Sequence, residues 1–335
     1  MVRSKRLLVT GGAGFMGTNF VQYWCGKYPD DRVIVLDALT YAGIRSNLAK
    51  LKGNFRFVHG NICDRALVDS LLATERIDTI VHFAAESHVD RSISSPAAFV
   101  QTNVIGTFTL LEAFRDHSEA ARFLHVSTDE VYGSLDADDP AFTEQSPYAP
   151  NSPYSASKAS SDHFVRAFSK TYDVPTLITH SSNNYGAYQF PEKLIPLMCI
   201  NMLLGKPLPI YGDGLNVRDW IYVEDHCRAL DAVIQRGQIG ETYNIGGGNE
   251  ITNIELVDIL CELMNELAPD LPVRPCQKLI TYVTDRPGHD RRYAIDITKI
   301  KTELNWQPIE QIETGLRKTV LWYLNYSDWW RSLAL

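Results

Sequence analysis

The sequence has no apolar run of the roughly eighteen residues that a membrane helix needs, and the first six residues lead into a strand-like run without a signal-peptide region. Its six cysteines show no CxxC spacing, and no pair of histidines has the spacing of a zinc site. Basic residues are also few, since 32 Lys and Arg stand against 40 Asp and Glu. The resulting net charge of −8 argues against a nucleic-acid partner, because a phosphate backbone needs a basic face. We therefore expect a reduced, cytoplasmic protein without a structural metal and without a membrane or nucleic-acid partner.

The 335 residues, 45% hydrophobic and 21% charged, have the composition of a globular protein. In the first half, apolar runs typical of buried parallel strands alternate with stretches of helical spacing. The runs are residues 7–10, 33–37, 55–59, 79–84 and 121–127, and the helical stretches include 18–27, 96–117 and 156–172. This alternation predicts an α/β fold with a Rossmann-like, doubly wound parallel sheet. Pro and Gly become denser after about residue 180, so we expect a first domain over residues 1–180, to which later segments return, and a smaller C-terminal substrate lobe over residues 181–330.

A glycine-rich loop follows the first expected strand. Gly11, Gly14 and Gly17 form a variant of the dinucleotide fingerprint, in which the backbone approaches a pyrophosphate and the next helix presents free N–H groups. Plain turns also use glycine, but here a strand precedes the loop and a helix follows it. The next strand ends at Asp37, where an acidic side chain accepts from the adenosine ribose and repels a 2′-phosphate. The loop therefore predicts NAD rather than NADP.

Tyr154 and Lys158 lie four residues apart, which places them on one face of a helix. A nearby ammonium group lowers the pKa of a tyrosine towards neutral pH and so makes it a usable base. Tyr23 and Lys27 have the same spacing, but they lie on the helix after the glycine loop, where we expect ordinary surface residues. Tyr154, in contrast, follows a strand that ends in residues 127–133, at the sheet edge where doubly wound folds bind ligands.

With the glycine loop, Thr128 at a strand end and the Tyr154–Lys158 pair, the chain resembles an extended short-chain dehydrogenase/reductase. Longer strings are similar to those of nucleoside-diphosphate-glucose 4,6-dehydratases, most often those acting on dTDP-glucose; they are residues 84–92, 127–133, 182–186, 190–196, 216–220 and 285–290. The resemblance covers residues 7 to about 330. Residues 128–133, Thr-Asp-Glu-Val-Tyr-Gly, are the most specific segment, because they separate dehydratases from related epimerases and decarboxylases.

The resemblance implies that dTDP-glucose is converted to dTDP-4-keto-6-deoxyglucose and water through tightly bound NAD. Oxidation at C4 makes the C5 hydrogen acidic, so a base can remove it while an acid protonates the departing C6 hydroxyl. Tyr154 is then the base for the C4 hydroxyl, Lys158 tunes it and holds the nicotinamide ribose, and Thr128 hydrogen-bonds the C4 oxygen. Asp129 is the acid at C6 and Glu130 the base at C5. We expect burial or the Glu130 charge to keep Asp129 protonated near neutral pH. Out of this context, an adjacent Asp and Glu would be a solvated turn.

The same resemblance implies that the domain of residues 1–180 binds NAD. The residues implied are Gly11, Gly14, Phe15, Met16, Gly17, Asp37, Thr40, Asn61, Ile62, Ala84, Ala85, Thr102, Tyr154, Lys158 and Asn184. One residue departs from the family pattern: Asn61 stands where the family usually has an aspartate that accepts from the adenine amino group. The side-chain carbonyl of Asn61 can still accept, so we expect weaker but surviving adenine recognition.

The resemblance also implies that the lobe of residues 181–330 binds the sugar nucleotide. The residues implied are Ser87, Thr128, Asn183, Lys193, Leu194, Pro209, Tyr211, Arg218, Asn253, Arg286 and His289. A diphosphate needs local cations in an acidic protein, and the guanidinium groups of Arg218 and Arg286 suit phosphate oxygens. Each of these cations alone could equally be a solvated surface residue, and His289 could be an ordinary loop histidine.

Other functions stay open at this point. A UDP-glucose 4,6-dehydratase is one, because the segments that line the base pocket look alike in both groups. A nucleotide-sugar 4-epimerase also oxidises C4, but it needs no acid and base at C5 and C6, so Asp129 and Glu130 argue against it. A catalytically silent NAD-binding regulatory protein need not keep these two residues together with Tyr154 and Lys158. In the resembled family, the helices at residues 96–117 and 156–172 also form a dimer interface, which implies a homodimer.

Overall fold

The computed structural model describes residues 4–117 and 121–333, and it is built around a seven-stranded parallel sheet. The strand order is β10-β6-β5-β4-β1-β2-β3. The strands are β1 (Arg6–Thr10), β2 (Arg32–Asp37), β3 (Phe55–His59), β4 (Thr79–His82), β5 (Arg122–Thr128), β6 (Thr176–Ser181) and β10 (Thr242–Ile245). The order reverses between β1 and β4, so a crevice opens beyond the carboxyl ends of these two strands. The predicted fold class is confirmed.

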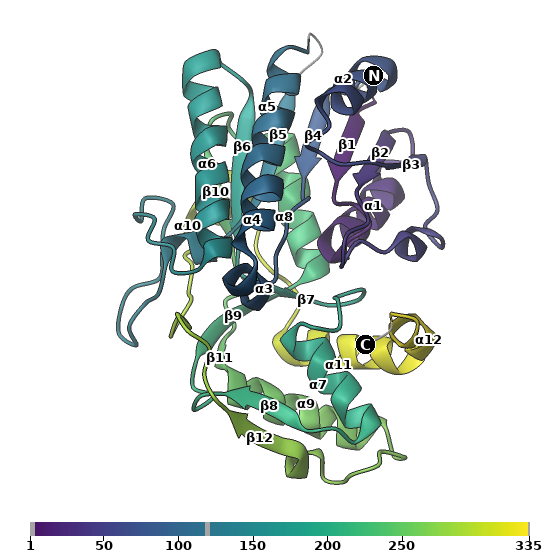
Figure 1. The fold of residues 1–335 in the computed structure, drawn as a ribbon, viewed down its shortest axis with the longest axis vertical. Helices are drawn as coiled ribbons and strands as arrows, with labels where there is room; N and C mark the ends of the chain where they lie inside the picture. Colours follow the sequence, from purple (N-terminus) through teal and green to yellow (C-terminus); the bar gives the residue numbers. More distant parts are fainter. Residues whose placement is uncertain (1–3, 118–120, 334–335) are drawn as a thin grey trace.

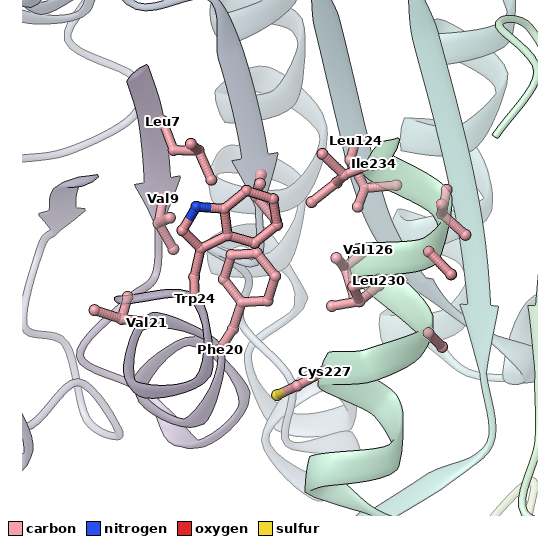
Figure 2. Packing of buried hydrophobic residues seen from close by; sticks show 14 of the residues in the cluster. Leu7, Val9, Phe20, Val21, Trp24, Leu124, Val126, Cys227, Leu230 and Ile234 are labelled. Atoms are coloured by element: carbon pink, nitrogen blue, oxygen red, sulfur yellow. The ribbon is translucent and has the colours of Figure 1, made fainter. Parts of the chain in front are cut away.

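Helices cover both faces of this sheet, which explains why its strands are continuous apolar runs. One face packs against α1 (Phe15–Lys27) and α8 (Val223–Arg236). Figure 2 shows Phe20 and Trp24 of α1 beside Leu7 of β1, with Leu230 of α8 across from them. The other face packs against three further helices, α2 (Arg65–Glu75), α5 (Thr107–Arg115) and α6 (Pro153–Tyr172). The α8 segment and β10 come late in the chain, so the chain returns to the large sheet after leaving it.

The segment between β4 and β5 differs from the single helix expected over residues 96–117. It forms α3 (Val89–Ser94), α4 (Pro96–Phe99), the π-helical turn η2 (Val100–Gly106) and then α5, which ends at Arg115. In η2, the amide of buried Asn103 pairs with both backbone groups of Glu86 and donates to Ser157 Oγ of α6 at 2.8 Å. The π turn thereby ties the loop after β4 to the first turns of α6.

The smaller lobe has its own apolar core and lies below the large sheet in Figure 1. Its strands are β7 (Asn183–Tyr185), β9 (Val217–Tyr222) and β11 (Glu250–Thr252) in one sheet, with β8 (Leu208–Tyr211) and β12 (Ile280–Val283) in a second. Its helices are α7 (Leu194–Leu204), α9 (Asn253–Leu267), α11 (Ile312–Asn325) and α12 (Ser327–Arg331). The helix α10 (Thr298–Leu304) packs against β10 and α8, and the short helical turns are η1 (Arg45–Leu48), η3 (Asp129–Tyr132) and η4 (Cys276–Leu279).

Two findings bear on chemistry and location. Within residues 4–117 and 121–333, no helix is both long and apolar enough to cross a membrane. Over the same ranges, no group of three or more His, Cys, Asp or Glu side chains is placed to hold a metal ion. All six cysteines are free thiols.

Candidate active site

A cleft lies at the carboxyl ends of the central strands, between the large sheet and the start of the smaller lobe. Its walls come from the glycine loop, the ends of β2, β3, β4 and β5, the first turns of α6, and the segment that follows β6. The predicted residues that line it are Gly11, Gly14, Phe15, Met16, Gly17, Asp37, Thr40, Asn61, Ile62, Ala84, Ala85, Ser87, Thr102, Thr128, Asp129, Glu130, Tyr154, Lys158, Asn183, Asn184 and Lys193.

The backbone of the glycine loop packs so closely against neighbouring backbone that no side chain fits at Gly11 or Gly17. A Cβ on Gly17 would lie 2.3 Å from the carbonyl oxygen of Gly11, and a Cβ on Gly11, where φ is +69°, would lie 2.7 Å from the backbone of Ala84. The helix α1 begins directly after Gly14, has no side-chain N-cap and has no acidic residue in its first turn. Its first N–H groups and positive dipole end are therefore free to meet the phosphates of a dinucleotide.

The carboxylate of Asp37 is fixed at the end of β2. Its two oxygens accept from Ala13 N at 2.9 Å and from Leu39 N at 2.8 Å, and burial raises its pKa. Each oxygen keeps a lone pair for a ribose hydroxyl. Just after the next strand, β3, Asn61 Oδ1 accepts from Cys63 N at 2.9 Å, so its side chain closes a turn as well as facing the cleft. The side-chain oxygen of Asn61, which we expected to accept from the adenine amino group, thus already accepts from a backbone N–H.

Tyr154 and Lys158 lie on the first two turns of α6, where a capping box between Ser152 and Ser155 fixes the start of the helix. The Tyr154 hydroxyl hydrogen-bonds with Thr128, while burial, followed by the charge of Glu130, raises the pKa of this tyrosine well above its ordinary value. A cation beside the phenol is needed to bring that pKa down. Lys158 is buried and donates from Nζ to the carbonyl oxygen of Val126 at 2.9 Å.

The two carboxyls of η3 differ in their electrostatic surroundings. Asp129 is 2% exposed, and burial, reinforced by the neighbouring charge of Glu130, raises its pKa well above the ordinary value. Among the described residues, none bonds to Asp129 Oδ2. Burial also raises the pKa of Glu130, but Arg286, Arg218 and Lys193 oppose that shift. Burial and the Glu130 charge thus favour the protonated form of Asp129, whereas the three cations favour the charged form of Glu130, which is the direction of division that an acid and a base need.

Cations gather beside Glu130, on the side of the cleft that faces the smaller lobe. Lys193 Nζ donates to the carbonyl oxygen of Ser87 at 2.8 Å, and the Arg286 guanidinium lies 3.7 Å from Asp90 Oδ1. The Arg218 guanidinium stacks over a tyrosine ring and donates to a backbone carbonyl at 2.9 Å. All three charges act on Glu130. They form a positive rim next to the acidic pair.

The remaining predicted substrate residues do not line the cleft itself. Tyr211 packs edge-on against His289, and the charge of Arg286 reaches both, so these three residues form one group next to the cleft. Asn253 lies at the start of α9, and its backbone N–H donates to Asn216 O at 3.0 Å. Outside the cleft lining are Leu194, Pro209, Tyr211, Arg218, Asn253, Arg286 and His289.

Among the cleft residues that the sequence analysis did not name are Tyr41 and Glu192. The Tyr41 hydroxyl lies 3.2 Å from Ser87 Oγ, and the guanidinium of Arg91 stacks over its ring. Glu192 lines the cleft next to Lys193, and no described residue bonds to its buried Oε1. Tyr41 follows the predicted residue Thr40, and Glu192 precedes the predicted residue Lys193, so both lie next to positions that the sequence indicates.

The strand order, the glycine loop and the Tyr154–Lys158 pair define an extended short-chain dehydrogenase/reductase. A family model described as GDP-mannose 4,6 dehydratase matches residues 8–319, so the chain belongs to this family. The chain is 55% identical to the dTDP-glucose 4,6-dehydratase of Neisseria meningitidis serogroup B over 98% of this chain and 96% of the other.

Solved structures show the same likeness. DesIV, the dTDP-glucose 4,6-dehydratase of Streptomyces venezuelae, solved with NAD and dTDP bound, is 50% identical with a TM-score of 0.91, covering 98% of this chain and 99% of the other. UDP-glucose 4-epimerase from Thermotoga maritima has a TM-score of 0.86 at 30% identity, over 96% of this chain and 99% of the other. Epimerases thus share the fold, whereas the relatives of high identity are dehydratases.

Proposed function

We propose that the chain is a dTDP-glucose 4,6-dehydratase, an NAD-dependent hydro-lyase that converts dTDP-glucose to dTDP-4-keto-6-deoxyglucose and water. The observation that carries this proposal is the pair of buried carboxyls in η3, with opposing electrostatic surroundings, beside the hydroxyls of Thr128 and Tyr154. Relatives more than half identical over nearly their whole length, which are named dTDP-glucose 4,6-dehydratase, support it.

The cleft fits NAD in three respects. The glycine loop leaves room for a pyrophosphate against the start of α1, Asp37 would hold the adenosine ribose, and Asn61 and Ile62 would adjoin the adenine. A carboxylate at position 37 disfavours a 2′-phosphate, so we assign NAD rather than NADP. Bound NAD supplies the hydride acceptor for C4 and the hydride donor for C6, so no added oxidant is consumed.

Tyr154 takes the proton of the C4 hydroxyl, and Thr128 holds the C4 oxygen in place. Lys158 supplies the positive charge that makes the tyrosinate accessible, because a cation close to a phenol favours its ionised form. All three side chains lie on rigid elements, the carboxyl end of β5 and the first turns of α6, so the geometry of this step is fixed before the substrate arrives.

Glu130 removes the C5 proton, and Asp129 gives its proton to the departing C6 hydroxyl, which leaves as water. The raised pKa of Asp129 keeps that proton available near neutral pH, and the three cations beside Glu130 favour its charged form. Glu130 returns a proton to C5 when hydride reaches C6, so it ends the reaction charged, as it began. The proton that Asp129 gives to the departing water is balanced by the proton that Tyr154 takes from the C4 hydroxyl, and exchange with solvent resets these two groups.

The nucleotide end of the substrate lies towards the smaller lobe in this proposal. Arg218, Arg286 and Lys193 form the positive rim and hold the diphosphate with Asn183. The group around Tyr211 and His289, with Pro209, Leu194 and Asn253, takes the nucleoside. Ser87 contacts the hexose. UDP-glucose is the alternative substrate, because nothing in this group distinguishes thymine from uracil by charge.

The quaternary state and the location are also proposed. Val100, Ile105 and Phe164 are 52%, 43% and 39% exposed on the outer side of η2 and α6, an apolar surface that suits a second copy of the chain. We assign a homodimer through this face, and a cytoplasmic location. Sedimentation of the protein tests the dimer: Phe164→Glu is expected to yield monomers, and a monomeric parent protein at micromolar concentration contradicts the assignment.

The experiment that tests the function is incubation of the protein with dTDP-glucose and, separately, UDP-glucose. We expect a product that absorbs in the near ultraviolet in alkali, as 4-keto sugars do, without consumption of added NAD. The two values of kcat/KM identify the preferred nucleotide. A galactosyl nucleotide as product would instead show a 4-epimerase, and no conversion of either sugar nucleotide would contradict the proposal altogether.

A further inference from the structure

A third ionisable side chain continues the reactive face of α6. Tyr154, Lys158 and Asp162 follow one another at intervals of four residues, which places them on one side of the helix, a turn apart. Asp162 is 1% exposed and faces the sheet between β5 and β6. It lies outside the cleft lining, and the mechanism proposed above does not use it. A fully buried carboxylate needs a physical reason to be there.

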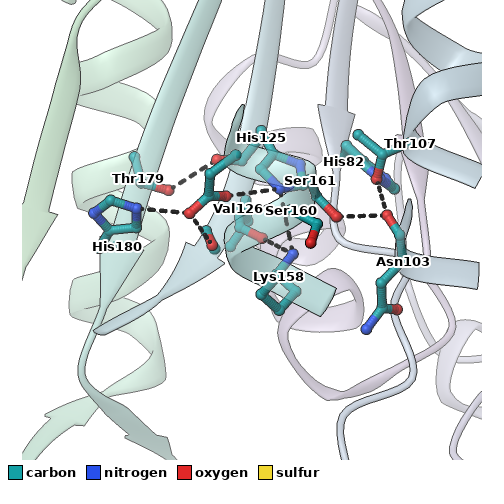
Figure 3. A network of polar contacts seen from close by, with 12 residues as sticks. His82, Asn103, Thr107, His125, Val126, Lys158, Ser160, Ser161, Thr179 and His180 are labelled. Atoms are coloured by element: carbon teal, nitrogen blue, oxygen red, sulfur yellow. Dashed lines mark hydrogen bonds and ion pairs between the residues drawn. The ribbon is translucent and has the colours of Figure 1, made fainter. Parts of the chain in front are cut away.

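Three neighbours hold the Asp162 carboxylate in its ionised form. Ser127 Oγ donates to Oδ2 at 3.0 Å, His180 Nε2 lies 3.0 Å from the same oxygen, and His125 Nε2 lies 3.2 Å from Oδ1. Burial alone would raise the pKa of Asp162, but the bonds from His125 and His180 outweigh it and hold the pKa well below its ordinary value. Figure 3 shows this network, with Lys158 and His125 at its centre.

His125 lies between the Asp162 carboxylate and the Lys158 ammonium group, and it cannot hydrogen-bond to both. His125 Nε2 lies 3.4 Å from Lys158 Nζ as well as near Asp162 Oδ1. Burial and the Lys158 charge lower the pKa of His125 to about 4, so the ring is neutral and carries one N–H. If Nε2 carries that proton, it donates to Asp162 and offers Lys158 nothing. Val126 O is then the protein acceptor for the ammonium group among the described residues.

Lys158 is therefore a buried cation with little compensation from hydrogen bonds. Burial lowers its pKa to about 8, and Asp162 is the group that opposes this shift. An opposite charge in a buried setting shifts a pKa by about one to three units. Without the aspartate, much of Lys158 would lose its proton near neutral pH.

We propose that Asp162 is a positioning residue whose buried negative charge keeps Lys158 protonated, so that Lys158 can act on Tyr154. The proposal rests on the function assigned above only where it concerns turnover. The other titratable groups that face this pair are three histidines and three tyrosines. They are His125 on β5, His82 on β4, His180 on β6, Tyr132 in η3, Tyr148 in the loop before α6 and Tyr154 on α6 itself.

Asp162→Asn keeps the shape of the side chain and removes its charge. We expect the alkaline limb of the kcat profile, which reports the loss of the Lys158 proton, to move down by about one to three pH units, while activity on the acid side of the limb is largely kept. Tyr148→Phe is the control for lost hydrogen bonding, because it removes a hydroxyl that contacts His180 Nε2 at 3.0 Å and also Asp162, while the negative charge stays in place. An alkaline limb at the same pH in the Asn variant and the parent protein overturns the proposal.

Thermal unfolding gives a readout that needs no turnover, so it stands even if the assigned substrate is wrong. The pKa of Lys158 falls from 10.5 to about 8 on folding, so the unfolded chain binds more protons between these values and stability rises with pH. In Asp162→Asn the folded pKa is lower still. The variant's loss in Tm is then greatest at and below about pH 7 and shrinks towards about pH 9. A loss that is constant with pH indicates a merely structural role and contradicts the proposal.

A double variant covers the case in which Asp162→Asn does not fold. If the lost charge acts through Lys158, Lys158→Met together with Asp162→Asn removes both charges and restores folded protein. If the double variant fails to fold as well, the carboxylate acts through its hydrogen bonds alone, and the proposal is wrong.

Discussion

The variant Glu130→Gln tests whether, of the two carboxyls of η3, Glu130 is the base and Asp129 the acid. Glutamine keeps the size and shape of the side chain but cannot take up the C5 proton. Thr128, Tyr154 and Lys158 are untouched, so we expect oxidation at C4 to survive while the loss of water nearly stops. The burial that dominates the pKa of Asp129 also remains, so this acid stays protonated near neutral pH even without the Glu130 charge.

The size of the effect follows from the role of a general base. A positioned base contributes about 10²–10⁴-fold to a proton transfer, or about 3 to 5 kcal/mol. The structure favours the upper part of this range. Arg286, Arg218 and Lys193 all act on Glu130, and an amide leaves their charges without this partner. The same three cations help to hold the substrate in our proposal, so binding of dTDP-glucose is expected to change far less than the elimination.

Rapid mixing of the variant with dTDP-glucose separates the two steps. The near-ultraviolet absorbance of reduced nicotinamide is expected to rise and persist, whereas the 4-keto-6-deoxy product is expected to form slowly. In heavy water, Glu130→Gln is expected to lose exchange at C5, while the control Asp129→Asn keeps this exchange and loses only the release of water. Equal losses of oxidation and elimination, or unchanged exchange at C5 in Glu130→Gln, would refute the assignment of the base.

Three further variants test the cofactor side. For Gly17→Ala, whose Cβ would lie 2.3 Å from a backbone carbonyl, we expect purified protein with little bound NAD and a lowered Tm; Gly26→Ala in the same helix, with nothing within 4 Å, is expected to gain about 0.5 to 1 kcal/mol in thermal unfolding. Asp37→Asn leaves one of two backbone N–H groups unpaired, so we expect about 1 to 3 kcal/mol lower stability and weaker NAD binding in equilibrium titration; unchanged binding contradicts this. Trp329→Phe removes the indole bond to Asn47 Oδ1 at 2.7 Å, and Asn47 in turn holds the glycine loop, so NAD is expected to dissociate faster at a cost of about 1 kcal/mol in stability; an unchanged dissociation rate contradicts this.

Four of the first five strands, β1, β2, β4 and β5, could be predicted from the sequence because nearly all of their residues are buried, whereas the edge strand β3 is only partly buried. The run at residues 33–37 matches β2, whose residues from Val33 onwards are all buried. The run at 79–84 extends too far, because β4 ends at His82 and the next residues line the cleft. The start of α1 was placed too late, at residue 18, since Gly14 offers no side-chain cap by which to recognise a helix beginning at Phe15.

The smaller lobe could not be predicted at the same level. Its strands are three to six residues long, and two of the three strands in one sheet, β7 and β11, have only three residues. Such short segments lack a clear period, and their pairing depends on contacts between distant parts of the chain. The π turn η2 was also hidden, because its apolar spacing is that of an ordinary helix and only the tertiary bonds of Asn103 distinguish it.

The active site, like the fold, has one part that the sequence predicts and another that it does not. Short strings such as residues 128–133 contain the reacting groups, so the sequence indicates them directly. The groups that surround Lys158 do not lie in these strings: His125, Asp162 and His180 come from β5, α6 and β6, and each alone is an unremarkable polar residue in a regular element. Only folding brings them behind Lys158. The face of α6 then carries an ionisable group at each turn, from the carboxylate through the ammonium group to the phenol, so a shift of this helix by one residue would move all three groups off the sheet together. The reactivity of Tyr154 thus depends on the packing of α6 against β5 and β6 as much as on the residues that touch the substrate.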